Sequence, residues 1–487
     1  MGTEGPGWSA LLSRAHLVYI VILGGGVMLY ALDIYIAATV LPSAVEDIGG
    51  LDYYAWSTTL FVIAAILGSA FSGRLLQVTG PRGAYSVAAL VFAVGTAICA
   101  MAPSMPVMLT GRVLQGFGGG ALYALAYVVI RLVLPEALWT RAIGLMSAIW
   151  GVATLIGPAV GGTFAEMGAW RFAFWVAIPF SATFAVLAFV ALPKRDGDKA
   201  ADGGLPFVQI GLLILAVLVL SSASAAPSLV WNIVGAAVSL VLVALLVFAE
   251  KRSGRRILPS SAHGFATPLA ALYATMALLI IGMQPQIFVP YFLQVLHGQS
   301  PLAAGYLAAL TAMGWTLGSV FNANASAARA RRLIVASPLM MVAALGTLAV
   351  MLPMVSKGGD WANLLPICAA LLLAGVGIGQ SWPHLVARVF QFAPEGERNR
   401  AAGAVTTVQL FAMAMGAATA GLAANLAGLT QADKMVGAAS AAFWLPLAFA
   451  LAPALAFVAA LRAVAQRTRA GLPFAPEERV DGRAAAG

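Results

Sequence analysis

The feature that most constrains this chain is a succession of long apolar segments, each bounded by charged residues, proline or glycine. Apolar residues make up 61% of the 487 residues and charged residues only 9%. A soluble domain carries about a quarter charged residues, and a helix that crosses a bilayer needs about 20 apolar residues. The composition therefore predicts an all-α membrane protein with many spans and little room for a separate soluble domain.

Fourteen apolar segments follow one another in blocks of six, two and six. The first block comprises Leu17–Pro42, Trp56–Ser72, Ala84–Met101, Val107–Leu134, Ala142–Phe164 and Phe172–Leu192. The middle pair comprises Phe207–Ala225 and Leu229–Phe248. The last block comprises Leu269–Leu293, Ala303–Phe321, Leu333–Met354, Trp361–Val389, Ala401–Leu426 and Ala438–Val464.

These blocks predict four parts of the chain. We expect an N-terminal six-helix bundle over residues 1–192, a central linker with two additional transmembrane helices over 193–256, a C-terminal six-helix bundle over 257–465 and a disordered cytoplasmic tail over 466–487. Two related halves with a binding site between them are a common plan among transporters.

The basic residues test the number of spans because they gather in alternate loops. With the N-terminus in the cytoplasm, the inner loops hold most of the Lys and Arg residues, whereas the outer loops hold only Arg171, Lys357 and Lys434. Losing or adding one span would place the later clusters outside. We therefore expect fourteen helices in a bacterial inner membrane with both termini cytoplasmic. Twelve spans is the alternative if the middle pair is not fully inserted.

Several other classes of protein fit the sequence poorly. The net charge of +9 comes from short clusters between apolar runs rather than from one patch, so no nucleic-acid partner is expected. Cys99 and Cys368 lie inside apolar runs, and no HExxH or GxxxxGK[ST] motif is present, so we expect no enzyme, cofactor or metal site. A membrane receptor or scaffold that transports nothing stays open.

Asp33 is the one acid that lies clearly within a span, and Arg112 is the clearest buried base. A charge near the bilayer centre costs at least roughly 2.5–3.5 kcal/mol. At about 1.5 Å per residue, Asp33 lies about 13 Å from the outer end of its span and Arg112 about 9 Å from the outer end of its own. An ion pair is therefore feasible. Asp33 either binds a coupling proton for which Arg112 competes, or the pair fixes helix packing permanently.

Four ordered motifs identify a resemblance that covers most of the chain. Leu32-Asp33 is followed by Val40-Leu41-Pro42, and the other three motifs are Gly73–Gly83, Gly111–Gly120 and Gly151–Gly162. The chain resembles the fourteen-span drug/proton antiporters of the major facilitator superfamily. The resemblance implies a fold of two six-helix bundles plus two additional central helices, and a role in proton coupling for Asp33 and Arg112. It also implies that residues of two motifs act in conformational change: Gly73, Gln77, Gly80, Arg82, Gly151, Gly157, Pro158, Gly161 and Gly162.

Two of these motifs can also be interpreted from the residues themselves. Gly157 and Gly161 lie four apart on one helix face and allow a second helix to approach, and Pro158 adds a kink. In the loop motif, Gln77 stands where the resembling family usually has an Asp that helps to hold the outward-facing state. An intact cytoplasmic charge latch is therefore not expected.

Polar and aromatic residues within the spans are the candidates for substrate binding. Gln284-Pro285-Gln286 and Pro290 suggest a helix that bends where it lines a polar cavity. The alternatives are helix packing for each aromatic side chain and interhelical hydrogen bonding for each glutamine. The full candidate set is Tyr30, Trp56, Gln115, Tyr123, Trp150, Gln284, Gln286, Phe288, Tyr291, Gln380, Trp382 and Gln409.

The leading hypothesis is a monomeric secondary transporter that exports amphipathic small molecules by proton antiport with alternating access. Its expected partners are the substrate, protons and the lipid bilayer. The alternative is an exporter of one endogenous metabolite or lipid-like molecule with weak or no proton coupling.

Overall fold

The computed structural model describes residues 11–194, 206–226, 228–253, 256–262, 267–323, 325–356, 360–394 and 397–470. The described residues form helices and no strands. The elements before the middle of the chain are α2 (Arg14–Ile48), η1 (Leu51–Tyr53), α3 (Trp56–Ala100), α4 (Met105–Val133), α5 (Glu136–Glu166), α6 (Arg171–Ala191), α7 (Phe207–Ser224) and α8 (Leu229–Arg252). They are followed by η2 (Ser260–Ala262), α9 (Pro268–Gly282), η3 (Gln284–Phe288), α10 (Val289–Val295), α11 (Pro301–Asn322), α12 (Ala327–Met351), α13 (Trp361–Phe392), α14 (Arg398–Leu426), α15 (Lys434–Phe449) and α16 (Leu451–Ala470).

The number of spans agrees with the prediction of fourteen. Thirteen helical stretches among the described residues are long and apolar enough to cross a membrane. One of them, Leu51–Ala100, has 50 residues, which at about 1.5 Å per residue is more than twice the bilayer core of about 30 Å. It contains a sharp kink at Gly80, where φ is +69°, followed by Pro81. This stretch therefore holds two spans, and the predicted fourteen-helix fold is confirmed.

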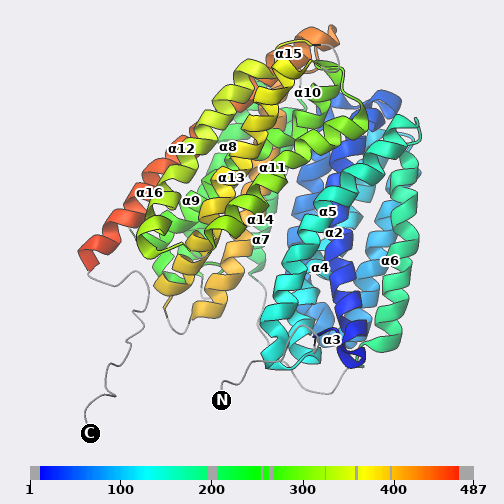
Figure 1. The fold of residues 1–487 in the computed structure, drawn as a ribbon, viewed down its shortest axis with the longest axis vertical. Helices are drawn as coiled ribbons and strands as arrows, with labels where there is room; N and C mark the ends of the chain where they lie inside the picture. Colours follow the sequence, from blue (N-terminus) through cyan, green and yellow to red (C-terminus); the bar gives the residue numbers. More distant parts are fainter. Residues whose placement is uncertain are drawn as a thin grey trace.

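The helices form two bundles, one from α2 to α6 and one from α9 to α16, with the α7–α8 hairpin added (Figure 1). We call the face at which α2 begins and α16 ends the terminal face, and the face at which α2 ends the far face. In Figure 1 the terminal face is at the bottom. The helix α16 continues through Ala470, and residues 471–487 of the predicted tail lie outside the described residues.

Glycines let one helix pair in each bundle pack with its backbones in contact. A Cβ atom at Gly116 or Gly120 of α4 would collide with the Phe61 or Ala65 carbonyl oxygen of α3. In the second bundle, a Cβ at Gly379 of α13 would collide with the Trp315 carbonyl oxygen of α11. Small residues of this kind allow close helix association where no hydrophobic effect drives it.

The apolar cores show which halves of the bundles touch. One core lies near the far face and joins both bundles, with Ile36, Val40 and Tyr54 from the first and Phe288 and Phe292 from the second. Near the terminal face, each bundle instead has a core of its own. The bundles are therefore joined at the far face and packed independently at the terminal face.

The α7–α8 hairpin covers one side of the junction between the bundles. Helix α7 packs on α14 and also touches α3, whereas most of α8 faces away from the protein. The Asn425 side chain of α14 donates hydrogen bonds to the Ser224 carbonyl of α7 at 2.8 Å and to the Asp52 carbonyl of η1 at 3.1 Å. One amide thus ties the hairpin and both bundles together at the far face.

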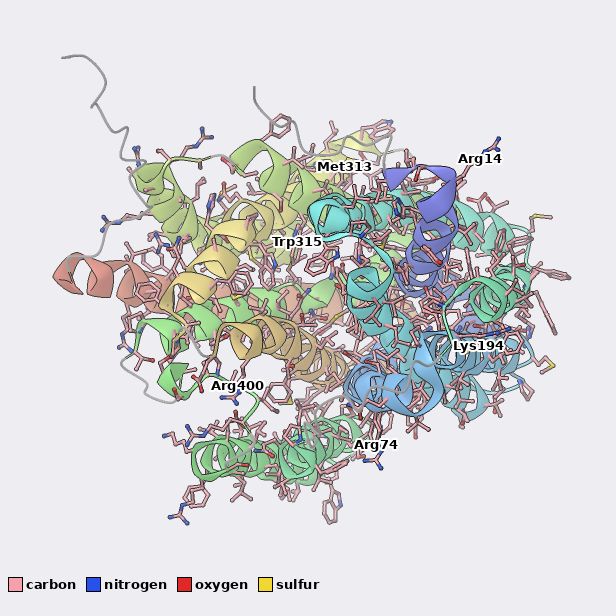
Figure 2. All side chains as sticks on the ribbon, turned by 90° about the horizontal axis from the view of Figure 1, so that it is seen from below. Arg14, Arg74, Lys194, Met313, Trp315 and Arg400 are labelled. Carbon is pink, nitrogen blue, oxygen red and sulfur yellow. The ribbon has the colours of Figure 1, made fainter. Side chains whose placement is uncertain are left out.

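Basic side chains gather at the terminal face. Arg14, Arg74, Lys194 and Arg400 are seen from that side, spread over both bundles, and all four are exposed (Figure 2). Among the described residues, the far face carries Arg171, paired with Asp47 at 2.5 Å, and Lys434, which lies 3.7 Å from Glu46. The far-face cations are thus partly balanced by acids.

Candidate transport site

The structure brings Asp33 of α2 and Arg112 of α4 together as a buried ion pair. The Arg112 Nη1 atom lies 2.5 Å from Asp33 Oδ2, and the side chains are 2% and 5% exposed, respectively. Because α2 and α4 run in opposite directions, similar depths below the far face place the two residues side by side. Two opposite charges withdrawn from solvent need further hydrogen bonds to offset their desolvation.

Gln115 supplies those hydrogen bonds from the next turn of α4. Its Nε2 donates to Asp33 Oδ1 at 2.8 Å and to Thr96 Oγ1 at 3.0 Å, while its Oε1 accepts from Arg112 Nη1 at 2.8 Å. The Cys99 thiol also donates to Gln115 Oε1 at 3.3 Å. Gln115, predicted as a substrate-binding candidate, is thus fully buried within the charge network.

Arg112 has two further contacts besides its carboxylate partner. Its Nε donates to the Ser57 carbonyl of α3 at 3.3 Å, and its guanidinium carbon lies 4.2 Å from the centre of the Phe61 ring. A guanidinium over an aromatic face gains a cation–π interaction. All of these groups belong to the first bundle, so the network needs nothing from the second.

An aromatic cluster lies next to this network, one helical turn nearer the terminal face. Tyr30, three residues before Asp33 on α2, has its ring 5.5 Å from Phe61, 5.3 Å from Tyr123 and 5.9 Å from Trp150. Helices α2, α3, α4 and α5 thus each contribute one ring. Side chains of α7 and α14 pack in the same cluster, which places it where both bundles and the hairpin meet.

The remaining candidates do not join this cluster. Gln284, Phe288 and Tyr291 are buried in the far-face core, and Trp56 packs at its edge. Gln380 and Trp382 lie on the terminal half of α13, where Gln380 donates to the Met340 sulfur and Trp382 contacts Trp315 at 5.3 Å. The two side chains left, Gln286 and Gln409, are partly buried. The twelve candidates therefore fall into separate groups and do not line one cavity.

Comparison with known proteins identifies the family of this chain. Residues 23–417 match the sequence profile of the Major Facilitator Superfamily. The chain belongs to the Major Facilitator Superfamily. A probable multidrug-efflux transporter of Mycobacterium tuberculosis is 38% identical over 87% of this chain and 91% of its own length. Multidrug resistance protein 3 of Bacillus subtilis is 23% identical over 80% of this chain and 76% of its own.

Solved structures agree with the Major Facilitator fold. A D-xylose-proton symporter superposes with a TM-score of 0.63 at 13% identity, over 92% of this chain and 97% of its own. A POT family peptide transporter superposes with a TM-score of 0.65 at 14% identity, over 96% of this chain and 99% of its own. Likeness at such low identity establishes the fold alone. Membership of the family indicates a transporter rather than an enzyme.

The glycine motif of α5 lies at two interfaces in this family member. Gly157 and Gly161 face α2, where added Cβ atoms would press against Tyr35 and against Ile36 and Thr39. Gly162 faces the second bundle, where an added Cβ would lie 2.5 Å from Leu302 Cα of α11. Pro158 stays within the helix and packs on Gly305 of α11. The motif therefore holds the bundles together near the far face, and Gly151, at its other end, faces open space.

The loop motif between the two spans of α3 stays within the first bundle. The Arg82 backbone N–H donates to the Pro193 carbonyl at 3.4 Å, and its guanidinium lies 3.9 Å from the Phe189 ring. Gly80 supplies the positive φ of the kink. Gly73 faces open space, and Gln77 is exposed. Within the described residues this motif makes no ion pair to the second bundle.

Three residues of the site were missed by the sequence reasoning. Thr96 holds Gln115 in place, Phe61 lies against Arg112, and Tyr54 is buried between the bundles. Thr96 carried a signal, being a polar residue in the middle of an apolar span. Phe61 is one of many span phenylalanines, and Tyr54 precedes the predicted start of its span at Trp56. Neither could be singled out by pattern.

Proposed function

We propose that this protein exports amphipathic small molecules of the multidrug type in exchange for protons. It would do so by alternating access of one central site to the two sides of a bacterial inner membrane, with both termini in the cytoplasm. The observation that carries the proposal is the buried Asp33–Arg112–Gln115 network beside a cluster of aromatic rings. The multidrug-efflux relatives and the basic terminal face support the cargo class and the orientation.

The network can release Arg112 without leaving its charge bare. A proton on Asp33 would cancel the carboxylate charge and with it most of the attraction to the guanidinium. Arg112 would keep the Gln115 Oε1 atom, the Ser57 carbonyl and the Phe61 ring as partners. Proton binding would therefore neutralise Asp33 and leave few buried polar groups without a hydrogen-bond partner. A pair with a purely structural role would not need these further partners for Arg112.

The aromatic cluster suits cargo that is apolar and weakly cationic. Tyr30 and Asp33 lie three residues apart on α2, so a molecule held on the Tyr30 ring lies one turn from the carboxylate. Aromatic faces bind apolar groups and attract cations. Cargo and proton would thus compete for the same end of the network, and one would be released when the other binds.

The proposed moving units are the bundles 1–192 and 257–465, with the 193–256 hairpin attached to the second. Two observations support that attachment. Helix α7 packs more extensively on α14 of the second bundle than on α3 of the first. At the far face, the Asn425 side chain of α14 donates a hydrogen bond to the Ser224 carbonyl at the end of α7.

The test is transport by purified protein in liposomes under an imposed pH gradient, with cargo chosen by a ligand thermal-shift screen. We expect uptake that the gradient drives, and Asp33→Asn should abolish the response to the gradient while ligand binding persists. Asp47→Asn is the matched control, since Asp47 is an exposed acid on the same helix. Transport by Asp33→Asn with an unchanged pH response would overturn the proposal. Cargo that moves without any response to the gradient in the unmodified protein would favour an uncoupled exporter of a metabolite or lipid-like molecule.

A further inference from the structure

Tyr54 occupies an unusual place for a residue in a connecting turn. It follows η1 and precedes α3, yet its side chain is 0% exposed. Its neighbour Tyr53 is partly buried and contacts Trp56 of the same bundle at 5.7 Å. Turns normally run over the surface, so the full burial of a tyrosine here requires that other parts of the fold cover it.

The partners of Tyr54 come from the second bundle. Its ring stacks on Phe288 of η3 at 4.9 Å with an interplanar angle of 22° and meets Tyr291 of α10 edge-on at 5.7 Å. These rings lie where the span Pro268–Val295 is broken by the 3₁₀ segment η3. Tyr54 thus fits into the break in the opposite bundle, at the face where the bundles are joined.

Three buried polar atoms, on Tyr54 and on the broken span, lack partners in this arrangement. The hydroxyls of Tyr54 and Tyr291 and the Oε1 atom of Gln284 are buried without a hydrogen bond among the described residues. A buried donor or acceptor without a partner destabilises the state that buries it. The contacts between the rings therefore stabilise the state in which the far face is closed, whereas the unpaired polar atoms destabilise that state.

We propose that Tyr54 is the residue that gates the far face, and this inference rests on the alternating access proposed above. To open that face, the bundles must withdraw the Tyr54 ring from Phe288 and Tyr291. The hydroxyls and the Gln284 amide then gain water, which offsets the lost ring contacts and keeps the gate reversible. Phe288, Tyr291 and Gln284 act as the receptor of this gate rather than as the main binding site for cargo.

The gate predicts opposite effects for two substitutions at one position. Tyr54→Ala removes the ring and should open the far face. Tyr54→Phe removes the opposing hydroxyl, keeps the ring, and should close the face more firmly. A residue with a merely structural role would lose function in both cases and would not shift the conformation in two directions.

The experiment measures access from the far face with a membrane-impermeant maleimide. Its reporter is Ala44→Cys, at a position that is 0% exposed in the far-face core, in protein whose Cys99 and Cys368 are replaced by alanine. In proteoliposomes, Tyr54→Ala should raise the labelling rate about three- to tenfold, the factor that loss of aromatic contacts allows. Tyr54→Phe should lower the rate, and the matched control Tyr53→Ala should leave it unchanged.

Equal labelling rates in the Tyr54→Ala and Tyr53→Ala proteins would overturn the inference, as would faster labelling of Tyr54→Phe. If the Tyr54→Ala protein does not fold, Phe288→Leu serves instead. It removes the second-bundle ring of the same aromatic pair and must raise the labelling rate. Labelling reports conformation and needs no cargo. Failure of the gate is therefore distinguishable from failure of proton coupling, which the Asp33→Asn transport experiment reports.

Discussion

The two bundles are alike in packing and different in the chemistry at their centres. Each contains a glycine-lined helix pair, α3 with α4 and α11 with α13. The first bundle holds a buried ion pair with a complete set of hydrogen-bond partners. Among the described residues of α9 to α16, no carboxylate is buried, and the broken span carries the neutral Gln284.

This difference indicates a division of roles between the bundles. Under the proposed proton coupling, the first bundle is the one whose charge changes, and the partners of Arg112 all lie within it. The second bundle has a break in one span at the junction, and under the proposed alternating access its part is a change of shape there. The following predictions test this contrast, from the largest expected effect to the smallest.

The largest effect is expected from Asp33→Leu, which removes the carboxylate charge opposite Arg112 together with the oxygens that accept from Arg112 and Gln115. We expect a loss of about 3–5 kcal/mol in the free energy of unfolding, largely restored by adding Arg112→Leu. The matched change in the second bundle, Gln284→Leu, removes a neutral amide and should cost less than about 1.5 kcal/mol. Unfolding titrations with SDS in mixed micelles measure these values. Equal losses of unfolding free energy in Asp33→Leu and Gln284→Leu would show that the two bundles do not differ in this way.

The glycine-lined pairs should respond alike in the two bundles. Gly120→Ala and Gly379→Ala each place a Cβ against a backbone carbonyl of the facing helix, so each should cost about 1–3 kcal/mol in the same titration. Gly346→Ala on α12, where an added Cβ meets nothing within 4 Å, is the control. A loss confined to one bundle would show that the packing is less symmetric than the contacts indicate.

A smaller effect is expected at the contact between the bundles. Gly162→Ala places a Cβ against the Leu302 backbone, so it should loosen the far face by about 1 kcal/mol while each bundle stays folded. The readout is faster maleimide labelling at Ala44→Cys with an unchanged unfolding midpoint. Gly151→Ala, in the same helix but facing open space, should change neither quantity. Unchanged labelling in Gly162→Ala would remove this glycine from the interface.

The smallest effect is a pH dependence confined to the second bundle. Burial of His297, only partly offset by the Leu352 carbonyl and Asp360, lowers the pKa of its imidazole below 6.5. The neutral ring donates from Nε2 to the Leu352 carbonyl at 3.1 Å and accepts from the Ser356 hydroxyl at 2.7 Å. A lowered histidine pKa means that the folded state binds fewer protons than the unfolded state.

The stabilisation from His297 is therefore complete above pH 6.5 and is lost as the pH falls from there through the lowered pKa. We expect the unfolding midpoint to drop over this range, and His297→Gln should flatten that drop. Asp33→Asn, in the other bundle, should leave this part of the pH profile intact. A profile that His297→Gln does not alter would contradict the assignment.

Much of the fold could be predicted from the sequence because a bilayer leaves few alternatives. Span length and loop charge were enough to give fourteen helices. Asp33 and Arg112 could be paired because two intramembrane charges at similar depth have few other partners. The kink at Gly80 and Pro81 also follows from residue type, because Gly tolerates positive φ and Pro cannot continue the ladder of hydrogen bonds.

The contacts between segments far apart in the chain could not be predicted in this way. Gln115 looked like a cavity residue, but its position three residues after Arg112 places it in the charge network. Phe288 and Tyr291 looked like cavity residues too, but which ring meets them depends on how the two bundles dock. Tyr54 illustrates the limit, since it lies in a turn and both of its aromatic partners come from the other half of the protein.

The hairpin of α7 and α8 has a consequence for biosynthesis. The ribosome completes both helices before it makes any helix of the second bundle, yet outside the hairpin α7 packs mainly on α14, one of the last helices to be made. The face of α7 that becomes buried carries Gln209, Ser221 and Ser224, which are poorly suited to lipid. During synthesis this face can dock only on α3 until α14 is inserted. A chain that stops before α14 would therefore leave this polar face of the hairpin without its main cover.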